Sequence, residues 1–406
     1  MEKIQAIDRD DRMGYLFLLT PYALAPMALS VLMGRRLAIF AAVFTSLLGC
    51  LLVVETLLFD YLLGALLCGL VAVYSTHELR KRSRLTQAGL FVGSTTLVLA
   101  FTLGHIAVFT ANQDSIDWVF IGVQCLTALF AGIFSATLIG GILPVLESLF
   151  RLTSNMSWIE LTDLNHPLLK RMTMEAPGTY HHSLIVANLA SAAAEKVGAN
   201  ATMCRACAYF HDIGKLAKPL YFIENSSQAG VKNPHDDLAA SMSTLVIVSH
   251  VKEGVDLAIQ NKLNSQIIDV IREHHGTSLV YYFYRRALKK QEEVRAAVEA
   301  GEANEEDIPE VKEQRFRYPG PIPQTVESAI ISLADSVESA CRSMTKPTPA
   351  KVEQMIDDIF NKRMKDGQLD DCQMTLAELS DVKESFFSTL SGMTHQRVSY
   401  EDDEEE

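Results

Sequence analysis

Long apolar stretches, interrupted by only a few charges, make up the first 150 residues of the chain. A helix needs roughly 20 apolar residues, with about 17 to 25 usual, to cross the hydrocarbon core of a bilayer. Five uncharged stretches in succession are too many for the buried helices of a soluble core. The pattern therefore predicts a transmembrane region at 13–150 after an N-terminal stub at 1–12. The expected spans lie near 14–34, 37–58, 61–77, 87–110 and 118–146.

The pattern changes after residue 151 to shorter amphipathic segments with caps and breakers, and no convincing alternating strands are present. We therefore predict an all-α fold: a polytopic transmembrane helix bundle of about five spans, a linker helix at 151–176 and a cytoplasmic all-helical domain at 177–392. Candidate helices lie near 158–175, 178–197, 200–212, 236–251, 255–274, 278–300, 324–344, 349–365 and 375–391. An insertion at 285–323 could form a lid, and residues 393–406 predict an acidic disordered tail.

Basic residues in the connections indicate which side of the membrane each connection faces, because cytoplasmic loops carry an excess of Lys and Arg. Residues 34–36 and 77–84 are positive, whereas Asp60 and residues 111–117 supply only acidic charges. We therefore expect a multi-pass protein of the inner or plasma membrane, held in the lipid bilayer, with everything after Arg151 in the cytoplasm. The outside start without a signal segment suggests that a preceding span, and with it an outer domain, is missing from this chain.

Charge and cysteine content narrow the classes of partner. The chain of 406 residues has 36 basic and 49 acidic side chains, and the whole net charge of −13 lies after residue 151. Such an acidic chain is a poor binder of phosphate backbones, so we expect no nucleic-acid partner. The seven cysteines are too few and too scattered for a disulfide scaffold. Cys204 and Cys207 form a CxxC without a second pair, and we interpret them as small core residues.

Two features of the predicted spans could have a function. Pro21 and Pro26 should kink the first span, because each removes a backbone hydrogen bond. His105 is an ionisable residue at membrane depth, which by default marks a site. We favour the plainer interpretation, a neutral histidine that is hydrogen-bonded to a neighbouring helix.

Histidines gather in the second half of the chain: eight of eleven fall between His166 and His275. Several occur in segments suited to burial, such as CAYFHDIGK, STLVIVSH and SQIIDVIREHH, where the helix ends at the histidine. Asp335 lies in the equally apolar SAIISLADSVESA, where a bare carboxylate would be costly. One such residue is usually a hydrogen-bonded core residue, but a shared cation would satisfy all of them together.

The set of candidate ligands is too large for one four-coordinate zinc. It fits two divalent ions of octahedral type, and imidazole and carboxylate ligands suit iron or manganese. The candidate metal ligands are His182, His211, Asp212, His250, His274, His275 and Asp335.

The pattern H…HD…D, centred on HDIGK, resembles the HD superfamily of metal-dependent phosphohydrolases. A polytopic membrane segment followed by EAPGTYHHS, FHDIGK, NPH, VSH and EHHGT is more specifically similar to the membrane-anchored 7TM-HD family, the PgpH-type cyclic-di-AMP phosphodiesterases. The resemblance covers the spans and the domain through about residue 392. The motifs are specific as a set, although HD alone would be weak. Full-length members carry an N-terminal span and an extracellular domain, which we expect to be missing from this chain.

The resemblance implies roles for individual residues. His182, His211 and Asp335 would bind one metal ion, and His250, His274 and His275 the second, with Asp212 bridging the two. Lys215 would contact a substrate phosphate and assist catalysis together with Asp212. His235, in NPHDD, is a candidate substrate contact or else a plain residue at a helix N-terminus. His181 is assigned to packing, since adjacent histidines on a helix diverge by about 100°.

The implied activity is two-metal hydrolysis of a cyclic dinucleotide, cyclic-di-AMP to linear pApA, by water that the two ions activate. A homodimer is compatible with the resemblance. Three alternatives stay open. A cyclic-di-GMP phosphodiesterase of HD-GYP type shares HDIGK but continues with GYP, where this chain has GTSLVYYFY. A (p)ppGpp or dNTP hydrolase would need fewer ligands and would not explain the membrane segment. A receptor could sense nucleotide without cleaving it, although every expected ligand is present.

Overall fold

A computed structural model describes residues 15–77, 79, 81–106, 118–226, 233–344 and 347–395. The chain divides into two compact units, residues 1–160 and 161–406. The described part is helical, and its one β-bridge joins Leu279 to Arg317, which confirms the all-α prediction. The predicted stub at 1–12 and most of the predicted acidic tail lie outside the described residues.

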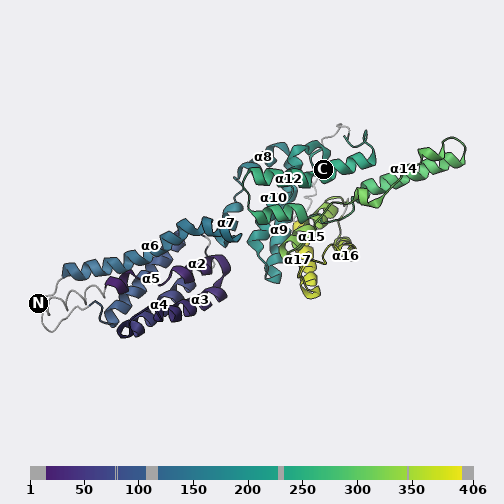
Figure 1. The fold of residues 1–406 in the computed structure, drawn as a ribbon. Helices are drawn as coiled ribbons and strands as arrows, with labels where there is room; N and C mark the ends of the chain where they lie inside the picture. The colour runs from purple at the N-terminus through teal and green to yellow at the C-terminus, as the bar shows by residue number, and fades with distance from the viewer. Residues whose placement is uncertain are drawn as a thin grey trace, which may run out of the picture. The chain divides into compact units, whose positions relative to one another are not determined.

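The first unit is a bundle of apolar helices (Figure 1). Its helices are α2 (Leu24–Met33), α3 (Arg35–Cys50), η1 (Glu55–Leu57), α4 (Leu58–Ser75), α5 (Arg82–Thr102) and α6 (Trp118–Phe150), followed by α7 (Asn155–Leu161). Four segments in the described part are long and apolar enough to cross a membrane: Tyr15–Met33, Glu55–Ser75, Arg82–Thr102 and Trp118–Phe150. The second predicted span, 37–58, is not one continuous helix, because α3 has 16 residues and ends at Cys50.

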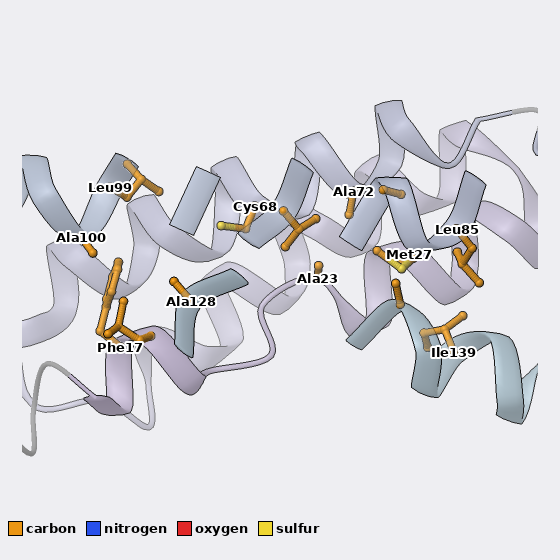
Figure 2. Close-up of a cluster of buried hydrophobic side chains, with 14 of the residues drawn as sticks. Phe17, Ala23, Met27, Cys68, Ala72, Leu85, Leu99, Ala100, Ala128 and Ile139 are labelled. Carbon is orange, nitrogen blue, oxygen red and sulfur yellow. The ribbon is translucent and has the colours of Figure 1, made fainter. Parts of the chain in front are cut away.

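The packing of this unit is typical of a membrane bundle, with small residues inside and large apolar residues outside. Figure 2 shows Ala23, Ala72, Ala100 and Ala128 in the buried cluster where the helices meet. Phe40 and Phe130 are instead 63% and 62% exposed, which in water would be unfavourable for residues of their size. The unit therefore belongs to a membrane protein, as the sequence predicted.

The two prolines of the first predicted span have different effects on its helix. Pro21 interrupts the first span, where residues 20–23 leave the helix, whereas Pro26 lies in the first turn of α2 and removes no intrahelical bond. The expected kink is thus a break at one proline.

His105 pairs with a neighbouring helix: its Nε2 lies 3.0 Å from Oδ2 of Asp60 in α4, and its ring stacks on Phe17.

The second unit surrounds helix α9 (Pro177–Val197), which packs on α10, α15 and α17. Its other helices are α8 (Pro167–Glu175), α10 (Ala201–Phe210), η2 (Ile213–Ala217), η3 (Pro219–Tyr221), α11 (Ile223–Ser226), α12 (Ala240–Gln260), α13 (Ser265–Glu273), α14 (Tyr281–Glu299), η4 (Glu305–Asp307), η5 (Glu313–Phe316), α15 (Val326–Arg342), α16 (Pro349–Lys365) and α17 (Leu376–His395). The far half of α14 extends beyond the other helices of this unit, so the predicted insertion at 285–323 begins as a projecting arm (Figure 1).

Two predicted boundaries differ from those of the structure. The expected linker helix at 151–176 consists of α7 and α8, separated at residues 162–166. The expected break between 251 and 255 does not occur, because α12 continues through Gly254 to Gln260. Gly254 is needed for close packing rather than for ending the helix: a Cβ there would lie 3.0 Å from Ile271 and 3.3 Å from the backbone of Gly214.

Candidate metal centre

The predicted ligands come together from five separate segments of the second unit. His182 lies in α9, Asp335 in α15 and His250 in α12, all buried. The remaining ligands lie where helices end: His211 and Asp212 follow α10, and His274 and His275 follow α13. At Gly276 the backbone has φ +55°, a left-handed conformation that ends the helix and lets both adjacent histidines reach the site.

A glycine also allows the segments to approach one another. A Cβ on Gly214, in η2, would lie 1.8 Å from the carbonyl oxygen of His250 in α12. Only a residue without a side chain permits this crossing of backbones. The contact brings His211 and Asp212, just before Gly214, next to His250. The glycine of HDIGK therefore has a geometric role in the site.

The seven side chains form two groups that share one residue. In each group one nitrogen or oxygen atom of every side chain lies within 4.8 Å of the others. The first cluster contains His182, His211, Asp212 and Asp335; the second cluster contains Asp212, His250, His274 and His275. Asp212 faces both, with Oδ2 3.3 Å from Nε2 of His211 and Oδ1 3.4 Å from Nε2 of His250.

Hydrogen bonds on the far side of the rings fix which nitrogen points inward. Nδ1 of His211, His250 and His274 donates to a backbone carbonyl three residues earlier, at 2.7, 2.6 and 2.8 Å respectively. Nδ1 of His182 bonds to the carboxylate of Glu338. With the proton on Nδ1, each neutral ring presents the lone pair of Nε2, which is the form that binds metal.

The inward-facing atoms fit a cation better than they fit one another. Nε2 of His250 and Nε2 of His274 lie only 3.3 Å apart, so two lone pairs face each other. Nε2 of His182, Nε2 of His211 and Oδ1 of Asp212 are buried and have no hydrogen-bond partner among the described residues. Buried polar atoms without a partner are costly. The donor set therefore fits metal ions, although its geometry does not identify which metal.

The electrostatics favour ionised carboxylates and mostly neutral imidazoles. Burial raises the pKa of a carboxyl group, but Lys215 and His211 hold the pKa of Asp212 well below its usual range. Burial and the neighbouring His211 lower the pKa of His274 to about 3. Burial would also lower the pKa of His211, but the Asp212 carboxylate outweighs it and raises the value to about 10. The first cluster thus favours positive charge, whether from a proton or from a metal ion.

Lys215 and His235, the predicted substrate contacts, lie in different surroundings. Nζ of Lys215 is 2.8 Å from Oδ2 of Asp212 and 2.8 Å from Oε1 of Glu224, so the ammonium group holds two carboxylates. His235 belongs to neither cluster. Its Nε2 bonds to the carbonyl oxygen of Tyr221 at 2.9 Å, and its ring packs on Phe283.

Three neighbours of the clusters were missed by sequence reasoning. Glu338 lies one helical turn after Asp335 in SLADSVESA, a spacing that could have indicated its place beside His182. Glu224 is distant in sequence from any ligand and carries no such signal. The ring of Tyr318, in the YPGP segment, lies 4.2 Å from the ring of His275. Cys204 and Cys207 are buried free thiols in α10, as expected for core residues.

The fold and the site define a polytopic helical membrane protein that carries an all-helical domain with two histidine and aspartate clusters. A family described as "7TM receptor with intracellular HD hydrolase" matches residues 3–154, and the HD domain family matches residues 179–340. The chain belongs to this family of membrane proteins with an HD domain. HD domains are metal-dependent, and the two clusters are groups that could hold the metal.

Individual relatives support the same assignment. The chain is 36% identical over 394 residues to the cyclic-di-AMP phosphodiesterase PgpH of Bacillus subtilis and 38% identical over 388 residues to PgpH of Listeria monocytogenes. These alignments cover 96% and 95% of the chain but 52% and 51% of the relatives, so the chain spans about half their length. A crystal structure of the L. monocytogenes PgpH HD domain in complex with cyclic-di-AMP is 44% identical, with a TM-score of 0.51, over 56% of this chain and 98% of that one.

Proposed function

We propose that the chain is a metal-dependent phosphodiesterase that hydrolyses cyclic-di-AMP to pApA. The observation that carries the proposal is the position of Asp212, whose two carboxylate oxygens face two separate groups of histidines. The PgpH relatives, which are cyclic-di-AMP phosphodiesterases, indicate the substrate class. Hydrolysis adds one water across one of the two phosphodiester bonds, which opens the ring to a linear dinucleotide with a 5′ phosphate.

The proposed ligands divide as the two clusters do. His182, His211 and Asp335 would hold one divalent ion and His250, His274 and His275 the other, with Asp212 between them. Imidazole and carboxylate donors together favour iron or manganese. When bound, such ions lower the pKa of water and neutralise charge on phosphoryl oxygens.

The remaining residues keep these ligands in place. Backbone carbonyls hold the proton on Nδ1 of His211, His250 and His274, and Glu338 does so for His182, so that Nε2 of these four rings stays available. Lys215 fixes Oδ2 of Asp212 and brings a positive charge to the edge of the first cluster, where a phosphate oxygen would arrive. A substrate contact by His235 would require its Nδ1, the ring atom that is buried without a hydrogen-bond partner.

We further propose that the second unit lies in the cytoplasm. The basic connections at 34–36 and 77–84 support this orientation, because such charges stay on the cytoplasmic side. A cytoplasmic site would meet a nucleotide second messenger where cells produce it. Protease protection in right-side-out and inverted membrane vesicles would test the orientation, and cleavage within residues 161–395 only in right-side-out vesicles would contradict it.

The experiment that tests the activity compares three substrates with the full chain in detergent or nanodiscs. Cyclic-di-AMP, cyclic-di-GMP and pApA are each incubated with Mn²⁺ or Fe²⁺, and products are separated by chromatography. We expect cyclic-di-AMP to be converted to pApA faster than the other two are consumed. Faster hydrolysis of cyclic-di-GMP would contradict the substrate assignment. Tight binding of cyclic-di-AMP without cleavage by the metal-loaded protein would instead indicate a receptor.

A further inference from the structure

A basic cavity of about 660 Å³ lies beside the metal centre, between the start of α14, α15 and α16. Its volume is within the range of about 300–1,000 Å³ that is usual for small-molecule sites. The residues that matter here are Tyr281, Arg317, Ser336, Lys362, Arg363 and Asp366. Its basic side chains outnumber its two carboxylates, Asp358 and Asp366, although the chain as a whole is acidic.

Arg363 is a cation of this cavity with an unsatisfied N–H group. Its NH2 group donates to Oγ of Ser336 at 2.7 Å, but NH1 is buried and has no hydrogen-bond partner among the described residues. No carboxylate in the described part forms a salt bridge with it. A buried N–H group of a charged side chain that has no hydrogen-bond partner is unfavourable. An anion in the cavity would supply the missing partner.

The neighbouring Arg317 does not compete for that anion. It forms a two-pronged ion pair with Asp366, at 3.1 Å from NH1 to Oδ2 and 2.9 Å from NH2 to Oδ1. The same pair occupies the Asp366 carboxylate, which is therefore not available to Arg363. Arg317 is thus neutralised within the cavity wall, whereas no salt bridge in the described part involves Arg363 or its neighbour Lys362.

The cavity is adjacent to the proposed reaction site. Ser336, which anchors Arg363, directly follows Asp335 of the first cluster in α15. Tyr318 packs against His275 of the second cluster, and Asp335 and Tyr318 both act electrostatically on the Arg363 guanidinium. A cyclic dinucleotide carries two phosphates joined by nucleosides, so a molecule with one phosphate at the clusters has a second anion nearby.

We propose that Arg363 binds the phosphate of the dinucleotide that is not being cleaved, and that the cavity holds the nucleoside next to it. The guanidinium fork suits this role, because it can direct two N–H groups at a phosphate. Lys362, whose Nζ lies 4.6 Å from the centre of the Tyr281 ring, adds positive charge at the cavity wall. This inference rests on the proposed cyclic-dinucleotide function.

The test uses Arg363→Gln, Arg363→Lys and a matched control, Arg272→Gln, in the full chain. Arg272 is a half-exposed arginine of α13 with one loose partner, Asp269, at 3.6 Å. Dissociation constants are measured with a non-hydrolysable phosphorothioate analogue of cyclic-di-AMP. Turnover is measured with cyclic-di-AMP and with bis(4-nitrophenyl) phosphate, which has a single phosphate group. Metal content and the melting temperature are recorded for each variant.

We expect Arg363→Gln to weaken binding of the analogue and raise KM for cyclic-di-AMP by roughly 10- to 100-fold, the value of one charged hydrogen-bonding contact. Arg363→Lys should fall between wild type and Arg363→Gln. Hydrolysis of bis(4-nitrophenyl) phosphate, metal content and the Arg272→Gln variant should change by less than about twofold, a difference too small for a lost charged hydrogen bond.

The outcomes separate this inference from the proposed function. Weaker binding by Arg363→Gln in a protein that cleaves no dinucleotide would support the anion site and refute the phosphodiesterase. Cleavage of cyclic-di-AMP with an unchanged KM would refute the anion site alone. A parallel loss on both substrates, with a lower melting temperature or less metal, would assign Arg363 to holding α16 on α15 and overturn the inference. Failure of the wild type to bind the analogue would also overturn it.

Discussion

The ammonium nitrogen of Lys215 lies 2.8 Å from Oδ2 of Asp212, the carboxylate that both ligand clusters share. The same nitrogen lies 2.8 Å from Oε1 of Glu224. All three groups are nearly excluded from solvent, and the two carboxylates share this one ammonium group. Removing one partner of such a buried arrangement leaves an uncompensated charge, whereas removing two partners together is less harmful.

A double-mutant cycle should therefore reveal strong coupling between Lys215 and Glu224. We expect Lys215→Gln and Glu224→Gln each to lower the stability of the second unit, and the double variant to lose less than their sum, with a coupling of about 1–3 kcal/mol. Thermal and denaturant unfolding followed by near-UV circular dichroism measures it. The exposed pair Lys383–Asp357, at 2.7 Å, is the control and should couple far more weakly. Additive effects at Lys215 and Glu224 would mean that the ion pair contributes nothing specific.

Removal of a proposed ligand should eliminate both metal and activity. We expect His182→Ala, His211→Ala or Asp212→Ala to lower bound metal below the wild-type value and to slow phosphodiester hydrolysis by at least about a thousandfold. Membrane insertion should be unchanged, because these residues lie in the second unit. His181→Ala is the matched control, since that imidazole neighbours His182 but is exposed and belongs to neither cluster. Full activity in Asp212→Ala would refute the ligand assignment.

Glu338 should act on the metal only through His182. Glu338→Gln removes the charge beside Nδ1 without removing a ligand, and loss of such a partner typically reduces metal affinity by about 10- to 100-fold. Competition with a chelator of known affinity measures this change. Glu353→Gln, an exposed position of α16, is the control. Unchanged metal affinity in Glu338→Gln would show that the contact with His182 is incidental.

Gly214 should tolerate no side chain. In Gly214→Ala the new Cβ would lie 1.8 Å from the carbonyl oxygen of His250 and 2.5 Å from the backbone nitrogen of Gly254, so η2 and α12 have to separate. We expect a loss of more than about 3 kcal/mol of stability, together with loss of bound metal. Gly392→Ala, in open space on α17, is the control and should be neutral or slightly stabilising. A folded, metal-loaded Gly214→Ala protein would contradict the packing described here.

Sequence patterns predicted the helical class and the seven ligands because both depend on local features. Runs of apolar residues indicate spans, and polar residues such as His211 and His274, directly after apolar helices, are unexpected in buried segments. The predicted helix end at residue 251 was wrong, because α12 continues to Gln260. Gly254 allows α12 to pack closely on η2, and sequence periodicity does not reveal such a contact. The α3 span was overestimated for a similar reason, since uncharged residues continue past Cys50 although the helix does not.

The supporting residues could not be predicted because their partners are remote in sequence. Glu338 meets His182 across 156 positions, and Ser336 meets Arg363 across 27. No residue-level pattern distinguishes Arg363 from other basic residues in the last turn of α16. Only the three-dimensional arrangement shows that its NH1 group is buried without a partner.

The placement of His211 and His274 directly after α10 and α13 bears on whether metal ions or the nucleotide bind first at the site. Helix carboxyl ends carry partial negative charge, and here they meet Asp212 and Asp335 in a small volume. A nucleotide approaching this region without metal would be repelled. Under the proposed function we therefore expect cations to bind before the dinucleotide, so that turnover depends on free metal as well as on the supply of the nucleotide.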